Sequence, residues 1–597
     1  MDKPQDTRRR KARGRVMVLL VLCCAVFALF LARLAWLQFA MADHYAQKMA
    51  EAGSASYTLP QHAARGAITD RSGTVLAQDE TVYDVYLRVP APPGTNLRET
   101  VNTIAALTGG KDVETQLAAF CSAVSAGELP VTQGLDSIGA AAYYHAGLVQ
   151  NGAVRLAARG VRRWPDGTIL PHTLGFTGPV TAEQWPAARA QGLAMDATIG
   201  QNGLEAAYDT LLRGRNGQLQ INVGLDGVTR ETMQTSAPVP GCTLVLTLDA
   251  DLQKTLQTAL QNQMDTLRTT KGIGAGREVR AGAAVVVDVR TGGILAAASL
   301  PDFDLSRYRS DYAALSADSD APLLDRVCQG LYAPGSAFKP AVAAAALTAG
   351  IDPAATVNCT GKYFYYSNYH PGCLQYGHRG PVDLRTALEY SCNIFFYDTG
   401  RRLGVDTFSA MARQLGLAND TGVEITAAQG RLTWSTDTNY QDGLTLMAAI
   451  GQGNTAVTPL QLAQYAAALA NYGRKPTLHF ADRAVQPATG AAVWQYEPAF
   501  TEIPGGEAVF GPIRDGMKRM AQTARALREA PVTVAAKTGS PQLADTLPSG
   551  SHYVNSVLIG YAPADDPQIA MAVVLEYGGG GANGAPVMRA VLDAWFE

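Results

Sequence analysis

Hydrophobic and polar positions change their spacing along the chain, and these changes predict where helices and strands lie. Residues 16–32, VMVLLVLCCAVFALFLA, contain no charged side chain. Counted through residue 37, the segment is long enough to cross a bilayer core as a helix. Residues 249–267 instead place apolar side chains at helical spacing on one face, which predicts an amphipathic helix. Residues 585–596 predict a helix at the end of the chain.

Apolar runs predict β-strands at both ends of the second half of the chain. Residues 283–299 form two such runs around RTGG, which is typical of a hairpin, and residues 553–578 form a second hairpin that turns at PADDP. Residues 531–540 predict a single strand, and the region from about 335 to 530 is largely helical. This order predicts an α+β fold: an antiparallel sheet closed by distant segments and flanked by helices, with an all-helical region beside it.

The first half of the chain mixes short strands with Gly and Pro. Residues 65–77, RGAITDRSGTVLA, predict two strands around an Arg-Ser-Gly turn, and residues 203–217 predict a short helix followed by Gly. The predicted organisation is a basic arm (1–15), a transmembrane helix (16–37), a β-rich elongated membrane-proximal domain (38–250) and a second domain (251–597).

Charge is distributed unevenly along the chain. The 597 residues carry a net charge of −3, which gives no indication of a nucleic-acid partner, but residues 1–15 hold seven Lys and Arg against two Asp. Basic residues before a span favour a cytoplasmic N-terminus, with the rest of the chain outside. A cleaved signal peptide or a buried core helix are the alternatives. The apolar run is long for a signal peptide and lacks a clear small-residue cleavage site, so we expect one uncleaved anchor.

The segment LYAPGSAFKPAVAAAAL, residues 331–347, combines one serine and one lysine with apolar neighbours. Positions i and i+3 share a helix face, so Ser336 and Lys339 are neighbours on the predicted helix. A serine hydroxyl becomes a good nucleophile when a base takes its proton, and lysine serves once burial or a nearby cation keeps it neutral. A helix cap and a solvent-directed lysine are the alternative, which this pair alone does not exclude.

Two later segments favour the chemical interpretation. Ser391 and Asn393 flank a cysteine in SCN, and Lys537 opens KTGS on the predicted strand. Lys537 is a candidate for the second cation that keeps Lys339 neutral, or for binding a carboxylate. Ser391 is a candidate proton relay to a leaving amine, and Asn393 can bind an amide.

The rest of KTGS adds candidate substrate-binding groups. Gly539 permits a substrate backbone to approach the strand closely. The backbone N–H groups of Ser336 and Ser540 are candidate oxyanion donors.

Ser-x-x-Lys, Ser-x-Asn and Lys-Thr-Gly, in this order, resemble the motifs of penicillin-binding proteins and serine β-lactamases. The segments RGAITDRSGTVLA, LPHTLGFTG, GLEAAYDTLLRG and AAVVVDVRTGGILAAAS are similar to those of class B, the monofunctional penicillin-binding proteins. The resemblance spans about residues 33–590. It implies a pedestal or dimerisation-type domain over 38–250, followed by a transpeptidase domain over 251–597.

The resemblance implies a peptidoglycan D,D-transpeptidase in the bacterial cytoplasmic membrane. Ser336 would attack the penultimate D-Ala of a stem peptide, terminal D-Ala would leave, and an amine of another stem would complete the cross-link. Lys537 and Thr538 would hold the substrate carboxylate, and β-lactams would acylate Ser336. This chemistry requires no cofactor. The resemblance also implies a glycosyltransferase partner of the elongation or division machinery, without indicating which. A β-lactam sensor or β-lactamase on the same core, and an inactive cell-wall scaffold, are the alternatives.

Residues 358–380 predict a second possible site. Cys359, His370, Cys373 and His378 lie within 20 residues, and thiolate and imidazole ligands suit tetrahedral zinc. Some class B relatives hold zinc in this loop. The candidate ligands are Cys359, Cys373 and His378, with His370 or an Asp as the fourth. A Cys359–Cys373 disulfide is the alternative. Cys392 is expected to be a small packing residue.

Overall fold

The computed structural model describes residues 5–41, 44, 55–92, 94–109, 113–123, 127–223, 229–270, 272–373 and 378–597. The chain forms two compact units. The first contains residues 1–63 and 215–239, and the second contains residues 64–214 and 240–597.

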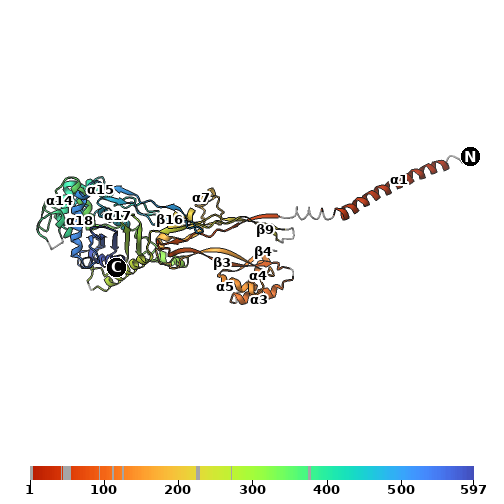
Figure 1. Ribbon diagram of the computed structural model, residues 1–597, viewed down its shortest axis with the longest axis horizontal. Coiled ribbons are helices and arrows are strands. Elements are labelled where there is room, and N and C mark those ends of the chain that lie inside the picture. Colours follow the sequence, from red (N-terminus) through yellow and green to blue (C-terminus); the bar gives the residue numbers. More distant parts are fainter. Residues whose placement is uncertain are drawn as a thin grey trace. The chain divides into compact units, whose positions relative to one another are not determined.

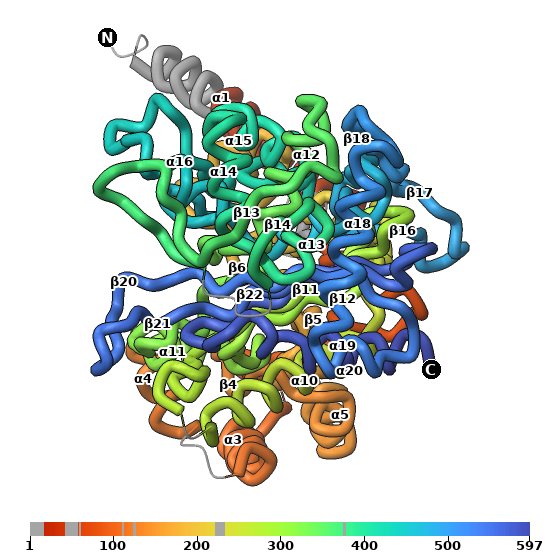
Figure 2. Tube along the Cα trace, turned by 90° about the vertical axis from the view of Figure 1, so that its left-hand side faces the viewer, coloured from red at the N-terminus to blue at the C-terminus, as the bar shows by residue number. Residues whose placement is uncertain are grey.

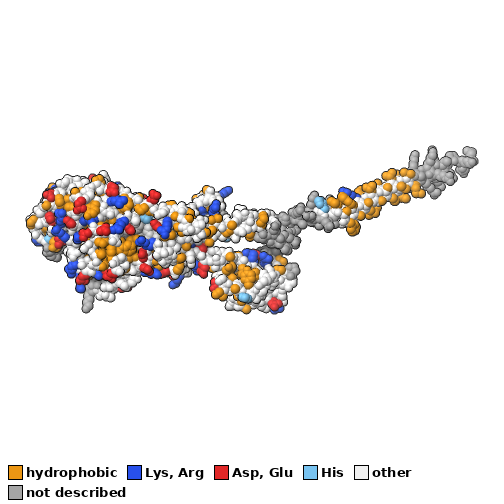
Figure 3. Space-filling view, viewed as in Figure 1, with side chains coloured by type: hydrophobic (Ala, Val, Ile, Leu, Met, Phe, Trp, Pro, Cys, Tyr) orange, Lys and Arg blue, Asp and Glu red, His pale blue; other side chains and the backbone are white. Residues whose placement is uncertain are grey.

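The first unit contains the apolar helix. Helix α1 (Gln5–Ala35) continues into a π-helical turn, η1 (Trp36–Ala40), and Met17–Ala40 is long and apolar enough to cross a membrane. Apolar side chains cover this segment in Figure 3, and the guanidinium of Arg33 lies 4.4 Å from the Trp36 ring centroid. The prediction of one apolar helix of membrane-spanning length is confirmed for the described residues. The same unit contains an antiparallel sheet ordered β1 (Ala55–Gln61), β8 (Gly217–Val223) and β9 (Thr229–Ser236).

The second unit begins with a sheet built around a long strand. Strand β3 (Val75–Val89) pairs with β4 (Gly127–Leu135) and β5 (Val154–Arg163). Helices α3 (Leu97–Leu107), α4 (Val113–Ala123) and α5 (Ser137–His145) share a core with these strands that includes Leu87, Ile104 and Tyr143. Toward its other edge the sheet continues through β2 (Ile68–Thr69), β10 (Thr243–Leu246), β16 (Ala481–Val485) and β17 (Ala492–Gln495). Residues 481–495 therefore complete a sheet that starts near residue 68.

The predicted turn within residues 65–77 is confirmed, because β2 and β3 pair across it. Asp70 holds the turn: its Oδ1 accepts from the backbone N–H of Ser72 at 2.9 Å and of Thr74 at 2.8 Å. Its Oδ2 accepts from the N–H of Ala250, 180 residues away, at 3.1 Å. These hydrogen bonds to the ionised form keep the pKa of the Asp70 carboxyl below its usual value, against the opposite effect of burial.

A five-stranded antiparallel sheet forms the centre of the C-terminal part. Its order is β12 (Ile294–Leu300), β11 (Gly282–Asp288), β23 (Ile569–Leu575), β22 (Ser556–Ala562) and β19 (Ala535–Gly539). Alternate residues of β11 face opposite cores: Ala284 and Val286 pack with α10 (Ala250–Arg268) and α20 (Ala585–Phe596), and Val285 packs on the other side. Both predicted hairpins and both predicted helices are confirmed, and so is the α+β class.

Helices fill the region on the other side of the sheet, where α14, α15 and α18 are grouped in Figures 1 and 2 and α17 is labelled beside them in Figure 1. The main helices here are α12 (Lys339–Thr348), α13 (Leu384–Glu389), α14 (Asn393–Leu403), α15 (Val405–Gln414), α16 (Asp442–Ala449), α17 (Pro459–Ala470) and α18 (Gly506–Thr523). Helix α17 is buried along its whole length and contacts β11, β22 and β23. Thr458 and Gln461 form a capping box at its start, and Pro459 occupies its first turn.

Shorter elements connect these layers. They are α6 (Pro171–Leu174), β6 (Thr177–Pro179), α7 (Trp185–Ala190), β7 (Thr198–Gly200), α8 (Gly203–Ala207), α9 (Asp209–Leu212), η2 (Leu305–Arg307), α11 (Tyr308–Ala317), β13 (Val357–Cys359), β14 (Gly380–Val382), β15 (Arg474–Pro476), β18 (Phe500–Glu502), α19 (Arg525–Arg528), β20 (Gln542–Thr546), β21 (His552–Val554) and η4 (Gly581–Gly584). The helix predicted in residues 203–217 is thus two short helices, α8 and α9, with Gly214 after them.

A buried ionic cluster joins the start of the second unit to α8. Glu205 has no solvent exposure, and its two carboxylate oxygens each accept from a guanidinium at 2.6 Å, one from Arg65 and one from Arg162. Arg65 also pairs with Asp209 at 2.7 Å. Two arginines around one fully buried carboxylate compensate for the loss of hydration, and neither is left with an unpaired charge.

We predict that Glu205→Gln destabilises the second unit by about 3 kcal/mol, because removing one partner of a buried ion pair leaves the other charges uncompensated. Thermal unfolding of the purified full-length protein would measure the change as a lower Tm. Glu80→Gln is the matched control, since Glu80 pairs with Arg163 on the surface at 3.3 Å with both side chains more than half exposed, and such pairs contribute at most about 1 kcal/mol. Equal melting of the two variants would contradict the prediction.

Candidate active site

Three segments that are far apart in the sequence meet at the edge of the five-stranded sheet. Ser336 lies in the 3₁₀ turn η3 (Gly335–Phe338), Ser391 and Asn393 lie at the start of α14, and Lys537 lies on β19. The predicted α-helix containing both Ser336 and Lys339 is wrong in its first turn, because α12 begins only at Lys339. In a 3₁₀ turn residues three apart eclipse each other, so the two side chains still share one side.

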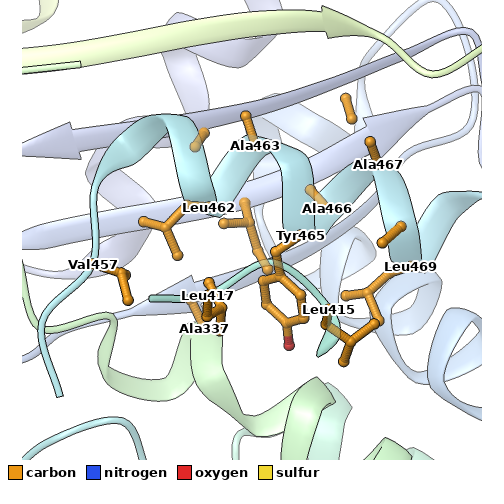
Figure 4. Close-up of a cluster of buried hydrophobic side chains, with 14 of the residues drawn as sticks. Ala337, Leu415, Leu417, Val457, Leu462, Ala463, Tyr465, Ala466, Ala467 and Leu469 are labelled. Atoms are coloured by element: carbon orange, nitrogen blue, oxygen red, sulfur yellow. The ribbon is translucent and has the colours of Figure 1, made fainter. Parts of the chain in front are cut away.

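The turn that carries Ser336 is held in place by packing against the hydrophobic core. Figure 4 shows Ala337 beside the side chains that α17 directs toward Leu415 and Leu417. Ala337, Phe338 and residues 340–346 of α12 are buried, as the sequence predicted. The Ser336 side chain remains partly exposed. The turn is therefore held from the core while Ser336 itself stays accessible.

Lys339 is completely buried and has three oxygen neighbours. Its Nζ lies 2.7 Å from Ser391 O, 2.7 Å from Asn393 Oδ1 and 3.1 Å from Ser391 Oγ. Burial lowers the pKa of the Lys339 amine to about 7. A neutral amine can donate to the two carbonyl oxygens and still keep its lone pair for a proton, which a base requires.

Lys537 approaches the same hydroxyl from the strand. Its Nζ is 2.9 Å from Ser391 Oγ and 3.0 Å from Thr538 O, and the side chain has no solvent exposure. Burial and the nearby charge of Lys339 hold the pKa of Lys537 well below its usual value. Ser391 Oγ therefore bridges two amines. Repulsion between like charges disfavours the state in which both amines are protonated to ammonium groups.

Within the described part of the chain, the amines of both lysines bond to Ser391, Asn393 and Thr538, and neither bonds to Ser336. The hydroxyl that the two amines share is that of Ser391. The structure thus brings all three motifs together, and it makes Ser391 the link between the amines.

Ser391 has an unusual backbone conformation. Its φ is +55°, in the left-handed region that non-glycine residues seldom occupy. The following N–H, that of Cys392, bonds to Ala387 O at 2.9 Å and fixes the turn between α13 and α14. This conformation directs both Ser391 O and Ser391 Oγ at Lys339.

Gly539 allows two backbone segments to approach each other. A Cβ at Gly539 would lie 2.2 Å from Pro334 O and 3.1 Å from Ala337 N. The segment that Gly539 admits in the structure is the chain's own turn around Ser336, and the approach of a substrate backbone to Gly539 stays a prediction. The physical reason is that this turn packs directly against β19.

Among the described residues no strand lies beside the outer side of β19, which is an edge of the five-stranded sheet. Thr538 lies on this strand and is partly exposed, and Ser540 follows it and is exposed. The Ser540 hydroxyl accepts from Gly581 N at 2.9 Å, so it anchors the end of the strand. An edge strand offers unpaired N–H and C=O groups to an extended peptide.

A cluster of three cysteines and one histidine includes Cys392, the residue that follows Ser391. One ligand atom from each of Cys359, Cys373, His378 and Cys392 lies within 4.8 Å of the others, and all four residues are buried. Cys373 Sγ is 3.7 Å from His378 Nε2, and Arg379 donates to Cys359 Sγ at 3.5 Å. The other imidazole nitrogen, His378 Nδ1, is buried without a partner in the described residues.

The structure differs from one sequence-based prediction: His370 is not a member of the cluster, because it is exposed and packs against the Phe364 ring, with centroids 5.0 Å apart. Cys392 is buried in the hydrophobic core, as expected, and its Sγ also lies in the cluster. The described residues contain no disulfide between Cys359 and Cys373, so the disulfide alternative is not what the structure contains. Sequence spacing could not identify Cys392 as a member of the cluster, because the fold of α13 and α14 brings it there.

His172, expected as a packing residue, lies elsewhere with its Nε2 2.7 Å from Pro322 O.

Comparison with protein families identifies two domains. Residues 282–593 match the penicillin-binding protein transpeptidase domain, and residues 60–246 match the penicillin-binding protein dimerisation domain. The first match covers more than half of the chain and contains all three motifs of the site.

Individual proteins give the same result. The chain is 28% identical to the peptidoglycan D,D-transpeptidase MrdA of Acinetobacter baumannii, over 100% of this chain and 89% of that protein. It is 26% identical to MrdA of Escherichia coli K12, over 90% and 87% respectively. A chain from a solved peptidoglycan synthase complex, studied for the coordination of polymerization and crosslinking, superposes with a TM-score of 0.74 at 28% identity, covering 98% of both chains. With its dimerisation and transpeptidase domains in this order, the chain belongs to the class B penicillin-binding proteins, among the homologues of MrdA.

Proposed function

We propose that the protein is a serine peptidoglycan D,D-transpeptidase and that Ser336 is its nucleophile. The observation that carries the proposal is the placement of Ser391 Oγ between the amines of Lys339 and Lys537, beside the turn that presents Ser336. The names of the relatives support the same reaction and the same substrate class, the stem peptides of peptidoglycan.

Acylation begins at the partly exposed hydroxyl. Ser336 Oγ attacks the penultimate D-Ala carbonyl of a stem peptide while neutral Lys339 accepts its proton. The N–H groups of Ser336 and Ser540 stabilise the oxyanion. The bond to terminal D-Ala then breaks, and its nitrogen takes a proton delivered through Ser391.

The proton route follows from the hydrogen bonds of Ser391. Its Oγ contacts both amines, so a proton accepted by Lys339 can pass through this hydroxyl without entering solvent. An amine from a second stem attacks the acyl-enzyme, loses its proton to the same groups and releases Ser336. Asn393, bonded to Lys339, positions the amine and faces the substrate amide.

The strand β19 supplies the binding surface. The stem peptide extends along its free edge, and Thr538 with Lys537 holds the terminal carboxylate. β-Lactams present a strained amide and a carboxylate to the same groups, so they acylate Ser336.

We also propose that Cys359, Cys373, His378 and Cys392 hold a structural zinc ion. Three thiols and one imidazole match a tetrahedral zinc site, and the ring nitrogen beside the thiols is His378 Nε2, 3.7 Å from Cys373 Sγ. The ion would supply no chemistry to acyl transfer. Its ligand Cys392 lies between Ser391 and Asn393, so the four residues would fix the position of the proton relay.

For location and partners, we propose a single-pass protein of the bacterial cytoplasmic membrane. Met17–Ala40 would form the span, the basic residues before it would stay in the cytoplasm, and the catalytic domain would act outside. The similar chain in a peptidoglycan synthase complex supports assembly with an enzyme that polymerises glycan strands.

We predict that Ser336→Ala abolishes covalent labelling by a fluorescent penicillin and abolishes cross-linking, because no nucleophile remains. Gel fluorescence of the purified protein, with mass spectrometry of the labelled peptide, would measure this. Ser310→Ala, a change in an exposed serine of α11, should label as wild type. Label on another residue would contradict the assignment, and rapid loss of the acyl group with no cross-linking would indicate a β-lactamase.

A second prediction concerns the contact between β19 and the nucleophile turn. Gly539→Ala should slow penicillin acylation by about a hundredfold, because the new Cβ at 2.2 Å from Pro334 O displaces the turn that carries Ser336. Gly580→Ala is the matched control, since a Cβ there meets no atom within 4 Å and its φ is −64°. Stopped-flow acylation rates would compare them, and similar rates for both variants would contradict the packing argument.

A third prediction concerns the metal. The purified protein should contain about one zinc ion per chain, and Cys359→Ser or Cys392→Ser should lose it. Cys328→Ser should keep it, because Cys328 is buried but outside the cluster. Elemental analysis would measure the metal, and acylation should slow in both variants that lose zinc. Equal zinc content in Cys359→Ser and Cys328→Ser would contradict the site.

A further inference from the structure

Eight consecutive residues next to the site, 363–370, have the sequence YFYYSNYH. Five of them are Tyr or Phe, and none is Asp, Glu, Lys or Arg. Phe364 is 63% exposed, Tyr365 is 58% exposed and Tyr369 is 38% exposed. Adjacent exposed aromatic side chains on a soluble surface indicate a binding site. We call the exposed rings of Phe364, Tyr365 and Tyr369 the aromatic shelf.

The shelf has a rigid base. Tyr363 is buried, its hydroxyl donates to Asp398 Oδ1 at 3.0 Å, and Arg401 Nε donates to the same hydroxyl at 2.9 Å. The Arg401 guanidinium also lies 3.9 Å from the Tyr365 ring centroid, and the Tyr363 and Tyr365 rings are stacked with centroids 6.3 Å apart. The Tyr365 ring is thus held in place before any ligand arrives, which lowers the entropy lost on binding.

Residues 361–373 form a hairpin that carries the aromatic shelf, and this hairpin reaches the catalytic groups. Its two sides bond through Tyr363 N to Pro371 O at 3.0 Å and Cys373 N to Gly361 O at 2.9 Å. At its base, Gly372 O accepts from Asn393 Nδ2 at 3.2 Å. The shelf is therefore continuous with the site through Asn393, the residue that also accepts from Lys339.

The chemistry of the shelf fits a neutral sugar better than a charged peptide. Aromatic faces are electron-rich, and the C–H groups on one side of a pyranose ring carry partial positive charge, so sugars stack on such rings. Ser367 and Asn368, both exposed, add a hydroxyl and an amide for hydrogen bonds to sugar hydroxyl and acetamido groups. None of residues 363–370 is charged, and the guanidinium that lies against the Tyr365 ring, that of Arg401, is already paired with Asp398.

We propose that the aromatic shelf binds the glycan strand of peptidoglycan, the N-acetylated sugar polymer that carries the stem peptides. This inference rests on the proposed function, because it places the strand beside the site that receives one of its peptides. Binding there would hold successive stems near Ser336 and favour polymeric substrates over free peptides.

The test uses the full-length protein in detergent and fluorescently labelled glycan strands from which an amidase has removed all stem peptides. The double variant Phe364→Ala/Tyr365→Ala should raise the Kd for these strands about tenfold or more, which corresponds to about 1.4 kcal/mol. The pair Phe364→Tyr/Tyr365→Phe keeps both rings and should bind as wild type. Tyr144→Ala is the matched control, since Tyr144 is 50% exposed on α5 and should leave the Kd unchanged.

Penicillin acylation is measured in parallel, because penicillin carries no glycan. All variants should acylate at the wild-type rate, while cross-linking of polymeric strands should fall in the double Ala variant. An unchanged Kd in that variant, or an equal loss in Tyr144→Ala, would overturn the proposal; the first result would point to a protein partner on the shelf. Failure of wild-type Ser336 to react with penicillin would instead refute the transpeptidase assignment, while strand binding would still report on the shelf.

Discussion

The structure depends on one electrostatic constraint: two lysine amines are buried around a single serine hydroxyl. Neither Lys339 nor Lys537 has solvent exposure, and both contact Ser391 Oγ. Taking an ammonium group out of water is costly, so burial drives these amines toward the neutral form. The fold supplies oxygen acceptors at Ser391, Asn393 and Thr538 for the proton that the pair retains. Burial therefore has two effects. It makes the charged form of the amines costly, and it makes one amine available as a base.

Holding this arrangement requires close backbone packing from several directions. The turn carrying Ser336 lies against β19 at Gly539 and against side chains of α17 (Figure 4). Ser391 is held in a left-handed conformation by the turn between α13 and α14. Strain of this kind persists where the surrounding structure determines it. Each catalytic group is therefore positioned by packing that is remote from it in the sequence.

Asn393 connects the catalytic site to its surroundings. Cys392, immediately before it, belongs to the Cys and His cluster. The side-chain amide of Asn393 donates to Gly372 O, in the hairpin that carries the aromatic shelf. The proposed zinc ligands and the proposed glycan surface thus meet the proposed proton relay at adjacent residues. Regions outside the five-stranded sheet can in this way influence acyl transfer without touching the reacting atoms.

The sequence by itself determined the elements whose signal is local. The apolar run near the N-terminus, the hairpins of 283–299 and 553–578, and the helices of 249–267 and 585–596 follow from spacing and turn residues, so their positions could be predicted. The three motifs also indicated which residue types form the site. Only the tertiary structure decided that Ser391 bridges the two amines, that Gly539 receives the nucleophile turn, and that Cys392, not His370, completes the cluster. These contacts join residues from tens to about two hundred positions apart, and their geometry is set by how helices and sheet pack, which local periodicity does not encode.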